Sequence, residues 1–278
     1  AENGLNDVME WWNFVDWVED PAWKGGVPTG AETGGSSIIS LQLAYNLQLA
    51  ADLFEAFGNG RQAESYRQRA DRINQQVLAL CYDEGKGLLA NTPEKKHFSQ
   101  HASVMAILTG AWPDEKEKEV MKRVLEDKSL AQCSYYYFFY LVRALEATGM
   151  QGQYLQMLKP WEQQLELGLT TFVEEPDPTR SDCHAWSASP VYEMLALVSG
   201  IKPASPGFEA VRIAPDLNGL GEISTEMPHH KGSIQLDLKE SKNGKLKGRV
   251  MLPPGLSGTF AWKGQELPLQ PGENKVSF

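Results

Sequence analysis

The sequence contains little cysteine: only Cys81, Cys133 and Cys183 occur in its 278 residues. They lie far apart, and none of them belongs to a CxxC pair. Disulfide frameworks and structural zinc sites both need cysteines in sets, so this sparse, odd number argues against both. No HExxH or other paired-histidine spacing is present either. We therefore expect neither a metal ion nor a cofactor.

Excess positive charge and long apolar runs are also lacking. The 26 Lys and Arg residues are outnumbered by 36 Asp and Glu residues, which gives a net charge of -10. Nucleic acids and anionic membranes attract clustered Lys and Arg, so neither is an expected partner. No apolar run approaches the roughly 20 residues of a membrane span. The GxGxxG, GxxxxGK[ST] and GxSxG patterns of nucleotide-binding proteins and serine hydrolases are missing as well.

Helical periodicity dominates the first two thirds of the sequence. Apolar residues recur at helical spacing over 36–57, and Gly58 ends that pattern. After a short turn, a second helix is predicted over 61–82. Further helices are predicted over 99–109, 113–125, 134–148, 153–167 and 186–199, the last of them ending at Gly200. Consecutive helical hairpins with short turns are typical of a toroid or solenoid of α-hairpins.

The pattern changes after residue 200. Beyond a predicted linker at 201–206, polar and apolar residues alternate in short runs separated by "KNG", "PPG" and "QPGEN". Such runs are typical of short strands joined by turns. The sequence therefore predicts a mainly α protein with a β domain: a helical domain over 1–200 and a small antiparallel β-sandwich over 207–278.

The stretch "TTFVEEPDPTRSDCHAWSASP", residues 170–190, concentrates groups that can move protons or contact a ligand. Glu174 or Glu175 could activate a water molecule as a general base. Glu174 and Glu175 cannot together be the two catalytic carboxylates of an inverting glycosidase, because the two carboxylates of such an enzyme stand roughly 6.5–9.5 Å apart across the sugar. The alternative is a solvated acidic turn. His184 and Trp186 follow, either as sugar contacts or as structural residues of the fold.

A second cluster, "WWNFVDWVEDPAWKGG" at 11–26, holds four of the eight tryptophans with acidic residues between them. Aromatic faces stack on the C–H faces of sugars, and carboxylates accept hydrogen bonds from sugar hydroxyls. The mixture favours a carbohydrate site. The alternative is an aromatic core beneath a loop.

The order of these motifs resembles the C-terminal part of the bacterial α-L-rhamnosidases. The segment "WNFVDW" comes first, then helical hairpins, then "GLTTFVEE" and "SDCHAWSASP", then "GIKPASPGF" and a β domain. The resemblance covers essentially the whole chain. It implies the fold of that family of inverting glycoside hydrolases, part of an (α/α)6 toroid followed by a β-sandwich.

The resemblance also implies roles for particular residues. Glu174, at the end of "GLTTFVE", takes the position of the general base. His184 lines the sugar subsite, and Trp12 and Asp16 border the sugar. Trp17 and Trp186 complete the expected substrate contacts, which are Trp12, Asp16, Trp17, His184 and Trp186. Position 173, where many members carry Trp, is Val173 here.

The expected substrate is a rhamnose-containing oligosaccharide or glycoside. The general acid of the family lies in an Asp- and Arg-rich segment upstream of the tryptophan-rich stretch, and that segment is absent from this sequence. We therefore expect the chain to be the C-terminal portion of a longer polypeptide, inactive alone, whose full-length form acts in the periplasm or outside the cell. The alternatives are another (α/α)-toroid glycosidase or phosphorylase, or a non-catalytic carbohydrate-binding module.

Overall fold

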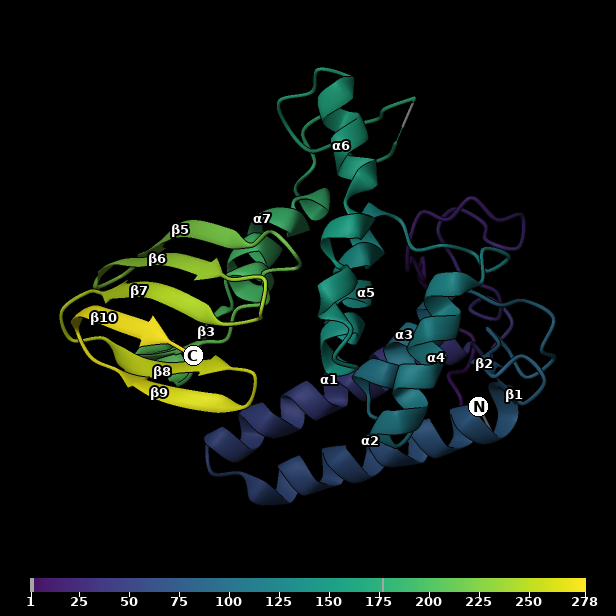
Figure 1. Ribbon diagram of the computed structural model, residues 1–278. Helices are drawn as coiled ribbons and strands as arrows, with labels where there is room; N and C mark the ends of the chain where they lie inside the picture. The colour runs from purple at the N-terminus through teal and green to yellow at the C-terminus, as the bar shows by residue number, and fades with distance from the viewer. Residues whose placement is uncertain (1–2, 177) are drawn as a thin grey trace. The chain divides into compact units, whose positions relative to one another are not determined.

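Two long helices form the first hairpin of the fold, as predicted. The computed structural model describes residues 3–176 and 178–278 (Figure 1). In it, α1 (Ser37–Ala56) and α2 (Gly60–Cys81) pack along each other. Ser36 caps α1 by accepting a hydrogen bond from a first-turn N–H, and Asn59 caps α2 in the same way. Gly58 has a φ of 77° in the turn, where glycine is favoured.

Three further helices confirm the middle of the prediction within a residue or two. They are α3 (Gln100–Leu108), α4 (Asp114–Glu126) and α5 (Tyr135–Ala147), and a short hairpin of β1 (Tyr82–Asp83) and β2 (Leu88–Leu89) precedes them. α3 is buried along nearly its whole length and packs against α1, α4 and α5. It is therefore a central helix of this part of the chain.

The two last predicted helices, 153–167 and 186–199, are not continuous. The first consists of the 3-10 turns η1 (Gln151–Gln153) and η2 (Leu155–Met157) and the helix α6 (Lys159–Glu166). The second consists of the 3-10 turn η3 (Ala185–Ser187), the helix α7 (Ser189–Glu193) and the π-helical turn η4 (Met194–Val198). Pro160 and Pro190 explain both breaks, because proline lacks an N–H and fits only the first turn of a helix.

Eight strands of the C-terminal region form two four-stranded sheets. In sheet order they are β10 (Gly272–Ser277), β7 (Leu246–Leu252), β6 (Gly232–Glu240) and β5 (Glu222–His229), and β3 (Ile201–Pro203), β4 (Ala210–Ile213), β8 (Ser257–Trp262) and β9 (Gln265–Leu269). A 3-10 turn, η5 (Pro206–Phe208), separates β3 from β4. One buried apolar cluster draws residues from both sheets, among them Ile213, Leu236, Val250 and Phe260.

The first sheet is wholly antiparallel, but the expectation of purely antiparallel pairing is wrong for the second. β4 and β8 pair in parallel. The three-stranded run β5–β7 lies between them in sequence, and so long a connection permits parallel pairing. The predicted linker at 201–206 is also partly wrong: Ile201 is 2% exposed and begins β3, so sheet formation starts earlier than the alternation suggested.

The chain divides into two units that are discontinuous in sequence. The first contains the chain up to Met150 together with Val173–Ser187, and the second contains Gln151–Phe172 and Ala188–Phe278. Val173–Ser187 includes Glu174 and His184. It therefore folds in the same unit as the tryptophan-rich segment, although about 150 residues separate the two in sequence.

Candidate active site

Glu174 lies on a tight loop whose backbone turns back on itself. Its N–H donates to the carbonyl oxygens of Arg180 at 3.0 Å and Ser181 at 3.2 Å. Ser181 has a φ of 50°, a left-handed conformation that few non-glycine residues adopt. The turn returns Arg180 to the side of Glu174, and the Glu174 side chain is only 7% exposed.

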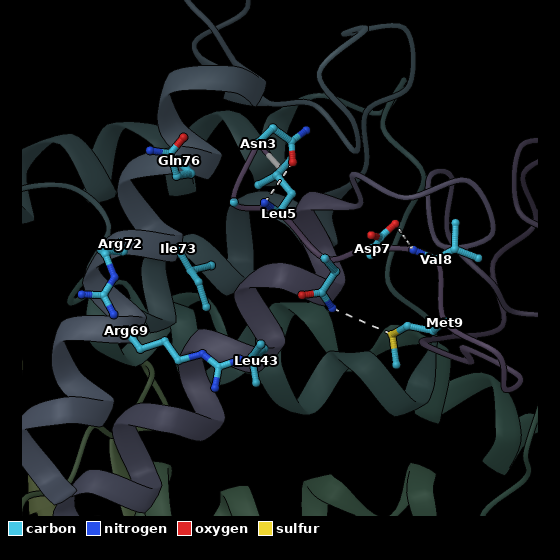
Figure 2. Close-up of a pocket in the computed structure, with 12 residues that line it drawn as sticks. Asn3, Leu5, Asp7, Val8, Met9, Leu43, Arg69, Arg72, Ile73 and Gln76 are labelled. Atoms are coloured by element: carbon cyan, nitrogen blue, oxygen red, sulfur yellow. Dashed lines mark hydrogen bonds between the residues drawn. The ribbon is translucent and has the colours of Figure 1, made fainter. Parts of the chain in front are cut away.

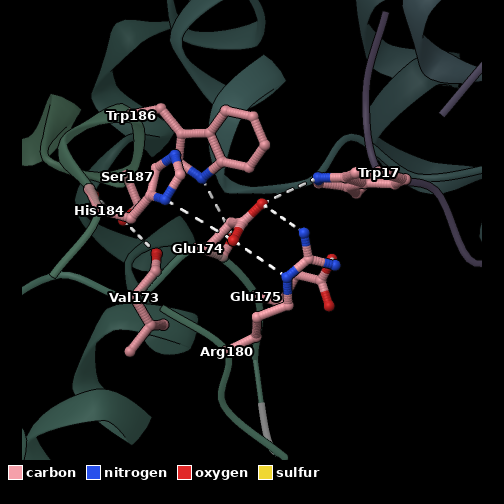
Figure 3. Close-up of polar contacts among 8 residues, drawn as sticks. All are labelled: Trp17, Val173, Glu174, Glu175, Arg180, His184, Trp186 and Ser187. Carbon is pink, nitrogen blue, oxygen red and sulfur yellow. Dashed lines mark hydrogen bonds and ion pairs between the residues drawn. The ribbon is translucent and has the colours of Figure 1, made fainter. Parts of the chain in front are cut away.

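The Glu174 carboxylate is held from two sides (Figure 3). The indole Nε1 of Trp17 donates to Oε1 at 3.2 Å. The guanidinium of Arg180 pairs with both carboxylate oxygens, with Nη2 at 3.3 Å from Oε1 and Nε at 3.2 Å from Oε2. Two-point pairing of this kind fixes the orientation of the carboxylate and also stabilises its negative charge. His184 stands nearby, its Nδ1 3.7 Å from Oε2.

These partners keep the Glu174 carboxyl ionised. Burial by itself would raise the pKa of Glu174. Hydrogen bonds from the Ser181 and Trp17 side chains and the positive charges of Arg180 and His184 outweigh burial, and the pKa of Glu174 lies below its ordinary value. At neutral pH such a group can accept a proton. It is poorly suited to donate one.

Aromatic rings form a continuous wall beside this carboxylate. The ring of Trp186 stacks on Phe14 at 6.0 Å between centroids and lies 4.5 Å from the ring of His184. Trp12 packs against Phe14 and Trp17 at 5.1 and 6.1 Å. Trp12 is 67% exposed, so this end of the wall is open to a ligand.

Trp186 and His184 are tied to the Glu174 loop. The indole of Trp186 donates to the backbone carbonyl of Glu174 at 3.1 Å. Ser187 donates to the carbonyls of Val173 and, at 3.1 Å, of His184. The structure thus gathers four of the residues expected around Glu174, namely Trp12, Trp17, His184 and Trp186.

Asp16 is placed differently from the expectation that it borders the sugar. Its side chain is 0% exposed. Oδ2 pairs with His101 Nε2 at 2.7 Å and accepts from the Ser134 N–H at 2.9 Å, while Oδ1 accepts from the Ser134 hydroxyl. The carboxylate is therefore enclosed by protein and is not presented to a ligand.

Sequence reasoning assigned no role to Arg180. The signal was present, since a basic residue follows Glu174 by six positions across a segment with two prolines. Sequence reasoning also assigned no role to His101, which lies at the start of the helix predicted over 99–109. Its pairing with Asp16 joins residues 85 positions apart, which no local pattern indicates.

A cavity of about 700 Å³ lies elsewhere in the same unit (Figure 2). The segment from Asn3 to Met9 lines it together with residues of α1 and α2, including the exposed side chains of Arg69 and Arg72. None of the six residues expected at the site lines this cavity.

Within residues 3–176 and 178–278, no three or more His, Cys, Asp or Glu side chains gather closely enough to hold a metal ion. Among the same residues, no helix combines the length and apolar character needed to cross a bilayer.

Comparison with known families identifies both parts of the chain. Residues 1–198 match a helical domain of the glycosidase class, the bacterial alpha-L-rhamnosidase 6 hairpin glycosidase domain. Residues 200–275 match the bacterial alpha-L-rhamnosidase C-terminal domain. The chain therefore belongs to the bacterial alpha-L-rhamnosidase family. None of the curated proteins compared with the chain matches it.

Solved structures agree with this fold. The GH78 family rhamnosidase of Bacillus sp. GL1 superposes with a TM-score of 0.78 at 24% identity, over 94% of this chain and 28% of that protein. The Streptomyces avermitilis α-L-rhamnosidase complexed with L-rhamnose gives a TM-score of 0.75 at 18% identity, over 100% and 29%. The Aspergillus terreus α-L-rhamnosidase gives 0.72 at 16%, over 85% and 30%. The chain thus spans 28–30% of the length of these proteins.

Proposed function

We propose that this chain carries the general base, Glu174, of an inverting α-L-rhamnosidase that hydrolyses terminal α-L-rhamnosides. Family membership supports the reaction class, and the rhamnose complex of a structural neighbour supports the sugar. The observation that carries the assignment is the ionised, two-sided pairing of the Glu174 carboxylate beside an aromatic wall. A solvated acidic turn would leave this side chain exposed and unpaired.

In the proposed reaction, Glu174 takes a proton from water while the water oxygen forms a bond to the anomeric carbon. The bond from that carbon to the leaving oxygen breaks, and a general acid protonates the leaving oxygen. We assign this acid to a segment upstream of the tryptophan-rich stretch. Arg180 Nε takes one acceptor site of Oε2 and the His184 ring nitrogen stands 3.7 Å from that oxygen, beyond hydrogen-bond range, so we propose that the water donates to the other site.

The aromatic wall supplies the sugar-binding surface. Trp12 and Trp186 offer ring faces to the C–H face of the sugar, and His184 offers a ring nitrogen to a hydroxyl. Trp17 contributes through its bond to Glu174 and its packing on Trp12. We further propose that residues 1–200 form part of the (α/α)6 toroid and that 207–278 form the trailing β-sandwich.

The test is Glu174→Gln in the native protein that contains this chain, assayed on an aryl α-L-rhamnoside, with Glu175→Gln as the matched control. Loss of a general base lowers turnover about 10²–10⁴-fold. Glu174→Gln should do so while rhamnose affinity, followed by tryptophan fluorescence, is retained, and Glu175→Gln should remain near wild type.

Near-wild-type turnover of Glu174→Gln would refute the assignment. A panel of other aryl glycosides separates a rhamnosidase from another toroid glycosidase. Rhamnose binding without any hydrolysis by the native protein would instead identify a binding module.

A further inference from the structure

The buried carboxylate of Asp16 joins three separate segments of the first unit. It lies in the tryptophan-rich segment, His101 is the second residue of α3, and Ser134 is the N-cap of α5. The Asp16 and His101 side chains are both 0% exposed. A buried carboxylate with this many partners is costly to disturb, so these contacts fix the position of the Asp16 backbone.

The backbone around Asp16 is fixed from a second direction. The N–H groups of Val15 and Asp16 both donate to the Gly26 carbonyl, at 2.9 and 3.3 Å. Gly26 has a φ of 75°, and a Cβ there would lie 2.4 Å from the Phe14 ring. Only glycine therefore permits this close approach, and the segment closes into a loop around it.

Trp17 is the next residue after Asp16, and it donates to Glu174 Oε1 at 3.2 Å. Anchoring Asp16 therefore also anchors the backbone from which the Trp17 indole reaches Glu174. A sugar contact is disfavoured for Asp16 itself, because the carboxylate is fully enclosed by His101 and Ser134.

We infer that Asp16 is a positioning residue, which with His101 and Ser134 sets the Trp17 indole against the Glu174 carboxylate. It acts through Trp17 and does not touch the sugar. The expected effect of Asp16 on turnover rests on the proposed function of Glu174. The expected effect of Asp16 on the position of the Trp17 indole does not rest on that function.

The first experiment measures the Trp17 indole directly. In the full chain labelled with 15N at tryptophan, the Trp17 N–H resonance is assigned by its loss in Trp17→Phe. Glu174→Gln and Asp16→Asn should both move this resonance. Asp20→Asn is the matched control, because Asp20 lies in the same segment and its side chain accepts a local N–H, from Ala22; it should leave the resonance in place. An unmoved resonance in folded Asp16→Asn would overturn the inference.

Ser134→Ala covers the case in which Asp16→Asn does not fold. It removes the hydroxyl that donates to Asp16 and caps the Tyr136 N–H, and it keeps the backbone donor to Asp16. A smaller shift of the Trp17 resonance in the same direction is expected. No shift in this variant would overturn the inference.

The second experiment separates positioning from sugar contact in the native protein. Misplacement of a reacting group can cost up to about 10²-fold in rate, so Asp16→Asn should lower kcat about 10–100-fold with KM nearly unchanged. The double variant Asp16→Asn/Trp17→Phe should be no slower than Trp17→Phe alone. A raised KM with unchanged kcat would instead identify a sugar contact. If Glu174→Gln kept full turnover, the proposed function would fail while the resonance shift still tested the positioning role.

Discussion

Replacing Arg180 by Gln tests the electrostatic argument at Glu174 most directly. Arg180 pairs with both Glu174 oxygens, at 3.2 and 3.3 Å, and its guanidinium lies 5.4 Å from the centre of the Trp17 ring. The substitution removes the charge and the two-point geometry together. Arg180→Lys is the matched variant, because it keeps the positive charge and loses the two-point geometry of the guanidinium.

The magnitude follows from the exposure of the two partners. A hydrogen bond to a charged group contributes about 1.5–3 kcal/mol, while an ion pair at the surface contributes about 0.2–1 kcal/mol. The Arg180 side chain is 55% exposed and Glu174 is 7% exposed, so solvent screens one side of the pair. We therefore expect Arg180→Gln to lower the free energy of unfolding by about 1 kcal/mol near neutral pH.

The sign of the pH dependence follows from the lowered pKa of Glu174. A carboxyl with a depressed folded-state pKa contributes stability above its unfolded pKa, and this contribution is lost as the pH falls through the folded-state pKa. The urea unfolding curves of wild type and Arg180→Gln should therefore differ at neutral pH and converge in acid, and the pKa of Glu174 should rise in the variant.

A stability difference that stays constant from neutral to acidic pH would refute this reasoning. Arg180 would then act by packing on Trp17 and not through the carboxylate. Since Arg180 Nη1 also lies 3.5 Å from Glu175, the pair of variants is repeated in a Glu175→Gln background, where the same convergence is expected.

Two further predictions concern the rest of the chain. Gly200 has a φ of 69°, and a Cβ there would lie 2.1 Å from the Ala214 carbonyl carbon, so Gly200→Ala should destabilise the protein by more than about 2 kcal/mol in urea unfolding. Gly219→Ala, at a φ of 83° with nothing within 4 Å, should cost only about 1 kcal/mol, and equal losses would contradict the clash argument. A thiol reagent should label exposed Cys183 first in the native protein, whereas Cys81, whose pKa burial raises to about 12, should react only on unfolding; early labelling of Cys81 would show that its surroundings are open.

Local sequence determined the helices whose signals are local. The apolar spacing of 36–57, with Ser36 ahead of it and Gly58 after it, specifies α1 by contacts within a few residues. Gly200 was expected to end the last helical segment, and its φ of 69° after η4 confirms this. Pro160 and Pro190 were equally visible in the sequence, yet the apolar periodicity around them favoured unbroken helices.

Motif order brought together the residues around Glu174, but it did not give the direction of their side chains. Trp12 packs on Trp17, Trp17 donates to Glu174, and Trp186 lies beside His184. Asp16 shares their motif and lies enclosed among other partners. A motif records which residue types occur at which spacing, and it does not record which groups each side chain meets.

By itself, the sequence determined the helical hairpins, the change to strands near residue 200 and the family of the protein, because these depend on short-range periodicity and on the order of motifs. Only the tertiary structure decided the parallel pairing of β4 with β8 and the enclosure of Asp16 by His101 and Ser134. It also decided that Arg180 and Trp17 pair with the Glu174 carboxylate. Except for that of Arg180, these contacts join residues tens of positions apart or more. Their energy comes from burial and pairing between segments, which local sequence does not encode.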